Sequence, residues 1–226
     1  MDDLEHPREP APRLVFFDLD GTITRRDTLI AYVAGFALRH PLRLFGFLAA
    51  LPALLRLLAV DRDRGQLKGE LLHAVMGGVS REQVAVWTTA FVPRLIARGC
   101  FREALDCIAH HRAAGDRLVL MSATVDLYVP EIAASLGFDD VVCSRVAWRD
   151  ERLEGRLIGA NVRDEEKARQ LRIVAARFPG RRIVGYGNSH PDLSHLRLVD
   201  QAVLVNPGAG LRRAAATLPV DFKTWL

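Results

Sequence analysis

The sequence predicts an α/β protein built on a doubly wound parallel sheet, with a helical segment inserted after its first strand. Two observations lead to this prediction. Short apolar runs of four or five residues recur along the chain and alternate with longer stretches of helical periodicity, the pattern of a parallel sheet covered by helices. One block, residues 28–98, departs from that alternation and is almost purely helical in its periodicity.

Four apolar runs are expected to form the strands of this sheet. The first, residues 14–18, ends in an acid and is followed by Gly21, so it would deliver Asp18 to the carboxyl end of a buried strand. Three later runs have the same form, at residues 117–121, 182–186 and 202–205. Helical patterns are found at residues 101–114, 125–136, 165–178 and 208–218.

The remaining segments complete the predicted organisation. Residues 146–158 alternate polar and apolar positions on either side of a charged turn, which indicates a β-hairpin. Residues 28–98 are expected to form a helical cap over the active site of a core made of residues 14–27 and 99–226. Ser80 follows two glycines and suits the N-cap of the next helix. Residues 1–13 are polar and proline-rich and are expected to form a flexible tail.

The composition is that of a packed globular protein, with 50% hydrophobic and 26% charged residues among 226. The net charge of +4 favours an anionic partner. The arginines are scattered and form no basic stripe, so nucleic acid is not expected. Cys100, Cys107 and Cys143 have no metal-binding spacing, which favours a reduced, cytoplasmic protein. None of these features predicts an oligomeric state.

Two carboxylates leave the first predicted strand together. Asp18 and Asp20 stand two residues apart and precede Gly21, so both would face one small volume where the strand ends. Like charges this close raise each other's pKa unless a cation lies between them, and magnesium held by carboxylates and substrate phosphate is such a cation. Taken alone, an Asp-x-Asp pair is more often a solvated strand end.

Three further elements follow in an order that strengthens the catalytic interpretation. Ser122 ends the second predicted strand, where its hydroxyl and the following amides could bind a phosphate oxygen. Lys167 opens a helix, where its ammonium would offset the charge of phosphate and of Asp18. Asn188 and Asp192 follow another strand and offer oxygen ligands to a metal. Singly, such a serine is usually a helix cap, and such a lysine usually belongs to a solvated face.

The ordered set resembles the four motifs of the haloacid dehalogenase superfamily, in its phosphoserine-phosphatase-like subgroup IB, over nearly the whole chain. The motifs are Asp-Leu-Asp-Gly-Thr at residues 18–22, Ser122, Lys167 and Gly-Asn-Ser-His-Pro-Asp at residues 187–192. The resemblance implies Asp18 as the nucleophile that forms an aspartyl-phosphate, Asp20 as general acid and base, and Ser122 and Lys167 as phosphate ligands. It also implies a C1-type cap, substrate contacts at Gly21, Thr22 and Ala123, and Mg²⁺ held by Asp18, Asp20, Asn188 and Asp192.

The fourth motif departs from the usual Gly-Asp of the superfamily, because it begins with Gly187 and Asn188. An amide can coordinate magnesium but brings no charge, so we expect weaker metal binding unless phosphate completes the coordination sphere. Asn188 is the feature that favours a different class of function, a non-catalytic phosphate-binding or membrane-docking protein with the same fold.

Asp27 lies nine residues after Asp18. The resemblance to phosphoserine phosphatases, which place a glutamate there for the ammonium group of the substrate, makes Asp27 a candidate for the same contact. An exposed acid favoured by the dipole at a helix N-terminus is an equal alternative.

Residues 42–60 are apolar except for Arg43 and Arg56, and Pro52 interrupts them. The stretch is too short to span a bilayer. It favours a helix pair at an anionic membrane surface, with arginines near the headgroups, and packing on the core or on a second subunit is an equal alternative. Residues 24–28, the apolar helices and residues 65–68 also resemble the membrane-associated lineage of the subgroup, which includes the phosphatidylglycerophosphate phosphatases.

Together these features predict a Mg²⁺-dependent phosphomonoesterase whose substrate is a lipid phosphate such as phosphatidylglycerophosphate. It would lie in the cytoplasm or at the inner face of the membrane. The alternative within the class is a soluble phosphatase for phosphoserine or another amino-alcohol phosphate.

Overall fold

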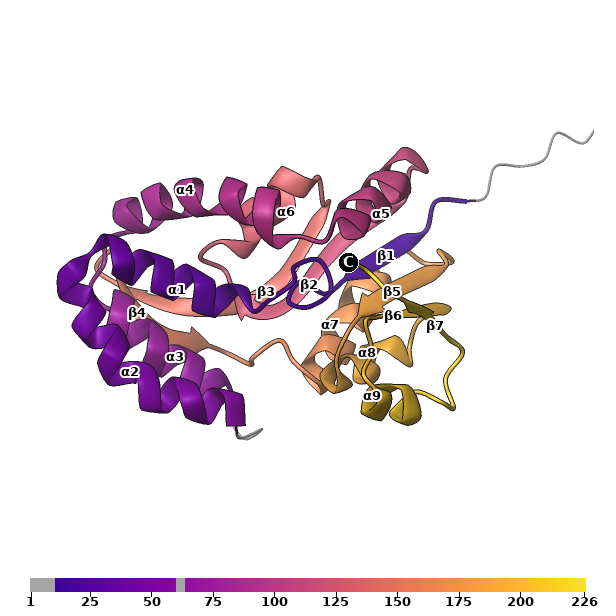
Figure 1. The fold of residues 1–226 in the computed structure, drawn as a ribbon. Coiled ribbons are helices and arrows are strands. Elements are labelled where there is room, and N and C mark those ends of the chain that lie inside the picture. Colours follow the sequence, from indigo (N-terminus) through magenta and orange to yellow (C-terminus); the bar gives the residue numbers. More distant parts are fainter. Residues whose placement is uncertain (1–10, 60–63) are drawn as a thin grey trace, which may run out of the picture.

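The computed structural model describes residues 11–59 and 64–226 and contains a seven-stranded sheet in the order β4-β3-β2-β1-β5-β6-β7 (Figure 1). All neighbouring strands are parallel except β3 and β4, which are antiparallel. The predicted α/β fold class is therefore confirmed. The strands are β1 Leu14–Phe17, β2 Arg117–Val125, β3 Asp140–Arg149, β4 Arg152–Ile158, β5 Ile183–Gly187, β6 Gln201–Val205 and β7 Val220–Lys223.

Strand β1 lies at the centre of the sheet and separates two apolar clusters. Its four residues are fully buried, and alternate side chains point to opposite faces. Val15 and Phe17 belong to the cluster that includes the inserted helices, whereas Leu14 and Phe16 pack with the helix that carries Lys167. The helices of the core are α5 Arg102–Ala113, α6 Val129–Leu136, α7 Glu165–Ala175, α8 Leu193–Leu196 and α9 Ala209–Ala214, with a 3₁₀ turn at His190–Asp192.

The inserted block is helical, and its first and last helices begin at side-chain caps. Asp27 caps the first of them, since its Oδ1 accepts a hydrogen bond from Ile30 N at 3.1 Å. Ser80 caps the last through a capping box with Gln83, as its position after two glycines predicted. The helices are α1 Thr28–Arg39, α2 Pro41–Ala59, α3 Arg64–Met76 and α4 Arg81–Gly99.

Three strands differ from the sequence-based expectation, the helix expected at residues 208–218 ends at Ala214, and the 3₁₀ turn and α8 were not expected. Strand β2 does not end at Ser122 but continues to Val125, with a shift of register against β3 between these two residues, so the helix expected from residue 125 begins only at Val129. Strand β3 starts at Asp140, because its first half pairs in parallel with β2 before the predicted hairpin begins. Strand β7 was not predicted, since its charged alternation at a sheet edge gives little apolar signal.

The β3–β4 hairpin leaves the core and supports the inserted helices. Leu153 N of β4 donates to Val79 O at 2.8 Å, and Gly78 N donates to Leu153 O at the same distance. Gly155 has a positive φ, and a Cβ there would lie 2.6 Å from the amide nitrogen of His73 in α3, so only glycine permits this close approach. One continuous apolar cluster consequently runs from β1 through α1, α3 and α4 to the hairpin.

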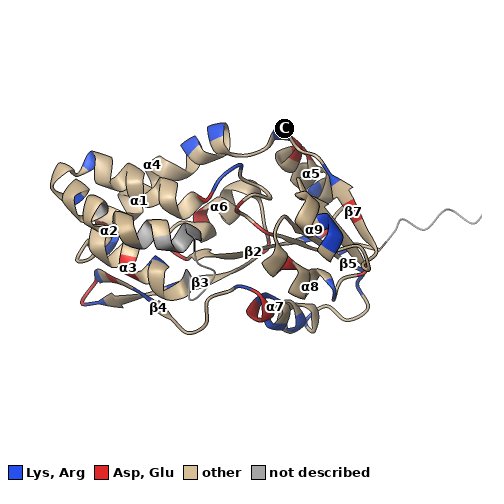
Figure 2. Ribbon diagram, turned by 60° about the horizontal axis from the view of Figure 1, so that its bottom comes forward, with Lys and Arg blue, Asp and Glu red and all other residues tan. Residues whose placement is uncertain are grey.

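The ends of two predicted segments lie outside the described residues, namely residues 1–10 of the expected tail and Val60 of the apolar stretch. Arg13, the last residue of the expected tail, is anchored, because its Nη2 lies 2.7 Å from Asp116 Oδ2. None of the helices in residues 11–59 and 64–226 is long and apolar enough to cross a membrane. Helix α2 nevertheless leaves Leu42, Phe45, Leu48 and Leu55 exposed, and its ribbon carries few charged positions (Figure 2).

Candidate active site

A cavity of about 780 Å³ opens beyond the carboxyl ends of the central strands, where ligands bind in sheets of this kind. Asp18 and Asp20 reach it from the turn after β1, and Lys167 reaches it from the first turn of α7. Predicted residues that line the cavity are Asp18, Asp20, Gly21, Asp27, Ser122, Ala123, Lys167, Asn188 and Asp192. Thr22 is buried behind this wall, where its Oγ1 donates to Asp18 Oδ2 at 3.2 Å.

Lys167 is the centre of the charge network. Its ammonium Nζ lies 2.6 Å from Asp18 Oδ1 and 2.6 Å from Asp192 Oδ1, and all three side chains are buried. Burial acts to lower the pKa of Lys167, but the two carboxylates outweigh it and hold that pKa above its usual value. A permanent positive charge is thus fixed against Asp18, where it would attract a phosphate oxygen.

Asp18 and Asp20 both have a pKa above the ordinary range of a carboxyl group. Burial raises the pKa of Asp18 to about 6, against the opposing effect of Lys167. Burial, followed by the charges of Asp27 and Asp18, raises the pKa of Asp20 to about 7. Thr28 N holds Asp20 in place by donating to its Oδ1 at 2.8 Å. A carboxyl group with a pKa near neutrality suits proton transfer in both directions.

Asp192 organises the turn after β5. Its Oδ2 accepts hydrogen bonds from Asn188 N at 3.1 Å, Ser189 N at 3.0 Å and Ser189 Oγ at 2.6 Å. Burial alone would raise the pKa of Asp192, but Lys167 and these donors hold it well below the usual range. Both oxygens of this carboxylate therefore have protein partners, and Asp192 holds Lys167 as well as lining the cavity.

The turn after β1 packs closely against the turn after β5. Gly21 has a φ of +81°, and a Cβ there would lie 1.9 Å from Asn188 Nδ2, so the Asp18–Asp20 turn and Asn188 are in van der Waals contact. Ser122 is buried and its Oγ accepts a hydrogen bond from Thr124 N at 3.1 Å. Ser122 and Ala123 thus present the middle of β2 to the cavity.

The donor set fits a hard divalent cation. Asp18, Asp20 and Asn188 supply oxygen atoms around one volume, and a cation there would favour the ionised forms of the two buried carboxyls. No cluster of three or more His, Cys, Asp or Glu side chains in the described part of the chain is arranged to hold a metal ion. The candidate metal ligands do not form such a cluster, because Asn188 contributes an amide and the Asp192 carboxylate contacts Lys167.

Several charged residues that line the cavity had no predicted role in the site, although residues 24–28 and 65–68 were noted for their resemblance to the membrane-associated lineage. Lys68 enters it from α3, Arg25 and Arg26 flank it from the turn before α1, and Arg163 flanks it from the segment before α7. The signal for Lys68 was its place on the apolar face of α3, four residues before Leu72. The arginines gave no comparable signal, because exposed arginines occur throughout the chain.

A model of the haloacid dehalogenase-like hydrolase family matches residues 15–197. The chain belongs to this family. Protein CicA of Caulobacter vibrioides is 33% identical over 196 residues, which cover 84% of this chain and 84% of that protein. A probable phosphatase of Mycobacterium tuberculosis is 29% identical over 217 residues, which cover 93% of this chain and 75% of that protein.

Solved structures share the fold. A protein of unknown function from Bordetella pertussis has a TM-score of 0.80 at 24% identity, covering 94% of this chain and 98% of that one. A substrate-bound phosphoserine phosphatase has a TM-score of 0.67 at 16% identity, covering 91% of each chain. The predicted membership of the haloacid dehalogenase family is thus confirmed, and phosphatases of this family generally use Mg²⁺. The solved structures show that the fold is shared with phosphoserine phosphatases.

Proposed function

We propose that this haloacid dehalogenase-like phosphatase is a Mg²⁺-dependent phosphomonoesterase that forms a covalent phosphate ester on Asp18. The observation that carries the proposal is the contact of the Lys167 ammonium with Asp18 and Asp192 at 2.6 Å each, inside the cavity that also holds Asp20. A nucleophilic carboxylate, a fixed cation and a second carboxyl group that can give and take a proton are the groups that phosphoryl transfer through an enzyme ester uses.

The proposed reaction has two steps. In the first, a carboxylate oxygen of Asp18 forms a bond to phosphorus while the bond to the leaving oxygen breaks, and Asp20 gives its proton to that oxygen. In the second, a water molecule attacks the phosphorus, Asp20 takes a proton from the water, and the Asp18–phosphorus bond breaks. Ser122 and the amide of Ala123 bind phosphate oxygens, while Lys167 offsets their charge.

The metal would be held by Asp18, Asp20 and Asn188, with Asp192 on the same side of the cavity. A bound Mg²⁺ offsets the negative charge that gathers on the transferred phosphate. Gly21 keeps Asn188 against the Asp18–Asp20 turn, and Thr22 orients the second oxygen of Asp18 by a hydrogen bond at 3.2 Å. We also propose that residues 28–98 act as the cap of a core made of residues 14–27 and 99–226.

Hydrolysis of para-nitrophenyl phosphate tests the reaction class. Wild-type protein with Mg²⁺ is expected to turn over, whereas Asp18→Asn is expected to retain the fold and lose turnover. Beryllium fluoride should be trapped by the wild type alone. No hydrolysis by wild-type protein would instead favour the non-catalytic phosphate-binding function, and substantial activity of Asp18→Asn would remove Asp18 from its role.

For the substrate we propose a lipid phosphate of the phosphatidylglycerophosphate kind, presented at a membrane surface. The support is the apolar row of α2, where Leu42 is 88%, Phe45 74% and Leu48 54% exposed. Removing such side chains from water is worth ~25 cal/mol per Å². The expected arginine contacts with headgroups have less support, because Arg43 Nη1 donates to Val75 O and Gly77 O, and Arg39 lies over the Trp87 ring. Apolar burial would therefore dominate vesicle binding.

Liposome co-sedimentation tests this substrate. Wild-type protein is expected to bind vesicles, and Phe45→Glu with Leu48→Glu to abolish binding and to reduce hydrolysis of a lipid phosphate in vesicles. The same variant should still hydrolyse para-nitrophenyl phosphate. Ile173→Glu, which charges an exposed apolar position on α7, is the matched control. A wild type that ignores vesicles would contradict the lipid proposal.

A soluble amino-alcohol phosphate such as phosphoserine is the second candidate. Asp27 favours it, because this acid caps α1 and also lines the cavity, where an ammonium group could meet it. A structural neighbour described as a substrate-bound phosphoserine phosphatase points the same way. Steady-state kinetics with phosphoserine and vesicle-borne phosphatidylglycerophosphate would rank the two, and a higher kcat/KM for phosphoserine would displace the lipid proposal.

A further inference from the structure

Helix α3 carries a lysine in the middle of its buried face. Side chains that are at most 1% exposed follow Lys68 at helical spacing, three, four, seven and eight positions later. They are Leu71, Leu72, Val75 and Met76. Lys68 itself is only 9% exposed. A charged group in such a stripe lowers the stability of the fold unless its surroundings compensate, so this position calls for a functional explanation.

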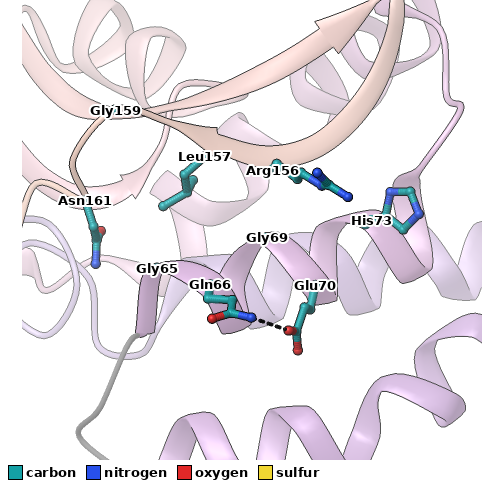
Figure 3. Close-up of a pocket in the computed structure, with 9 residues that line it drawn as sticks. All are labelled: Gly65, Gln66, Gly69, Glu70, His73, Arg156, Leu157, Gly159 and Asn161. Atoms are coloured by element: carbon teal, nitrogen blue, oxygen red, sulfur yellow. Dashed lines mark hydrogen bonds between the residues drawn. The ribbon is translucent and has the colours of Figure 1, made fainter.

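The packing of α3 fixes where Lys68 points. Two glycines on α3 bring the helix close to β4 and the segment after it (Figure 3). A Cβ at Gly65 would lie 3.3 Å from Asn161 Cβ, and a Cβ at Gly69 would lie 3.4 Å from Arg156 Cα. Helix α3 therefore packs closely on the hairpin, and Lys68, the neighbour of Gly69, reaches the catalytic cavity from this packed helix.

The ammonium of Lys68 is held by neutral oxygens. Its Nζ donates to Ala123 O at 2.7 Å and lies 3.5 Å from Asn161 Oδ1. Within residues 11–59 and 64–226 no carboxylate lies at ion-pair distance from it, in contrast to Lys167 with its two carboxylates. An ammonium has three hydrogens, so a hydrogen of Lys68 remains for a ligand in the cavity.

Lys68 reaches the cavity from a different element than Lys167, and it touches Ala123, whose amide is proposed to bind the transferred phosphate. Lys167 approaches Asp18 from the core, whereas Lys68 comes from an inserted helix and contacts the carbonyl of the residue after Ser122. Arg26, in the turn before α1, also lines the cavity. A cavity of about 780 Å³ has room for a leaving group beside the phosphate, and a positive charge on its cap side favours an anionic leaving group.

We propose, building on the phosphomonoesterase function above, that Lys68 binds a second anionic group of the substrate, carried by the leaving group. The chemistry that would satisfy it is a carboxylate or a phosphodiester within a few bonds of the scissile ester. Either would replace water around a buried ammonium with a charge-assisted hydrogen bond. Lys68 thus determines which phosphomonoesters are preferred, whereas Lys167 binds the phosphate group that all of them share.

Two matched pairs of substrates test this role and distinguish the sources of the anion. Phosphoserine and phosphoethanolamine differ by a carboxylate. The deacylated headgroup of phosphatidylglycerophosphate and glycerol 3-phosphate differ by a phosphodiester with its glycerol. The quantity compared is the ratio of kcat/KM within each pair, for wild type, Lys68→Met and Lys68→Arg. Lys223→Met, at an exposed lysine of β7, is the control.

We expect the wild type to prefer the doubly anionic member of one pair, and Lys68→Met to reduce that ratio roughly 10- to 100-fold. Lys68→Arg should stay nearer to the wild-type ratio, and Lys223→Met should match it. The responding pair identifies the anion. An equal fall for both members would show that Lys68 acts on the transferred phosphate or on folding, and would overturn the proposal. A wild type without preference in either pair would overturn it too.

Binding separates this proposal from the phosphatase function on which it builds. Calorimetric titration of the same compounds into Asp18→Asn, with and without Lys68→Met, gives the ratio of Kd values without turnover. Hydrolysis of none of the four compounds by the wild type would count against the proposed function. The quantity compared is the Kd of the singly anionic compound divided by the Kd of its doubly anionic partner. A fall of this ratio with Lys68→Met would still support the role of Lys68, and an unchanged ratio would refute it.

Discussion

Replacing Lys68 by methionine is expected to stabilise the protein while impairing its selectivity. Burial lowers the pKa of the Lys68 ammonium from 10.5 to about 8, although Asp20 and Asp27 oppose that shift. One pKa unit corresponds to ~1.4 kcal/mol, so holding the charged form in place costs about 3 kcal/mol at neutral pH. Methionine keeps the apolar stem but loses the hydrogen bond to Ala123 O, worth ~1 kcal/mol. The net gain is about 2 kcal/mol, or a Tm roughly 4–8 °C higher.

The pH dependence gives this prediction its sharpest test. Because the folded-state pKa of Lys68 lies below the unfolded-state value, the destabilisation is complete below pH about 8 and disappears as the pH rises toward 10.5. Urea unfolding should therefore show Lys68→Met more stable than wild type at pH 7 and nearly equal to it at about pH 10. Lys223→Met should follow the wild type throughout. A Lys68→Met protein that is less stable at pH 7 would show that Lys68 holds the fold together and would refute the reasoning.

Three further changes test the groups around the phosphate position. Asp20→Asn should slow hydrolysis of an alkyl phosphate by ~10²–10⁴-fold and of an aryl phosphate less, since a phenolate needs less protonation; equal losses in steady-state kinetics would contradict the acid role. Asn188→Asp should lower the Mg²⁺ concentration for half-maximal activity, and an unchanged value would place Asn188 outside the metal's ligands. Asp192→Asn should lower stability by ~3–5 kcal/mol in urea unfolding, because it breaks a buried ion pair with Lys167. Asp106→Asn, in an exposed pair, should have almost no effect.

The sequence predicted the parts of the fold that depend on local pattern. Apolar runs placed Asp18 beyond the end of the central strand and Asn188 after β5, and the order of the motifs identified the family. It failed where distant segments decide the structure. The first half of β3 is a strand because it pairs with β2, and the hairpin supports α3 through contacts between residues about 80 positions apart, such as His73 Nδ1 with Glu154 O.

The candidate site shows the same division. Asp18, Ser122 and Lys167 could be proposed from their motifs, and the structure brings them into one cavity. The engagement of Asp192 with Lys167 was not predictable, because a carboxylate among metal ligands and a carboxylate that holds a lysine look alike in a sequence. Lys68 was overlooked as a site residue for a related reason, since a lysine on a helix is usually solvated and only the packing of α3 buries this one.

The two proposals about the substrate rest on different faces of the inserted helices, and this makes them separable. The exposed row of α2 would bring the protein to a surface, whereas Lys68 lies on the buried face of α3 and would act only on a substrate already inside the cavity. Phe45→Glu with Leu48→Glu should therefore change vesicle binding and leave the ratios of the soluble pairs intact. If Lys68→Met lowers the kcat/KM ratio of the phosphodiester pair and the wild type binds vesicles through α2, the substrate is a lipid phosphate, because its headgroup carries a phosphodiester. If Lys68→Met instead lowers the kcat/KM ratio of phosphoserine to phosphoethanolamine and the wild type binds no vesicles, the substrate is a soluble amino acid phosphate. Asp27 lines the cavity, where it could meet the ammonium group of that substrate.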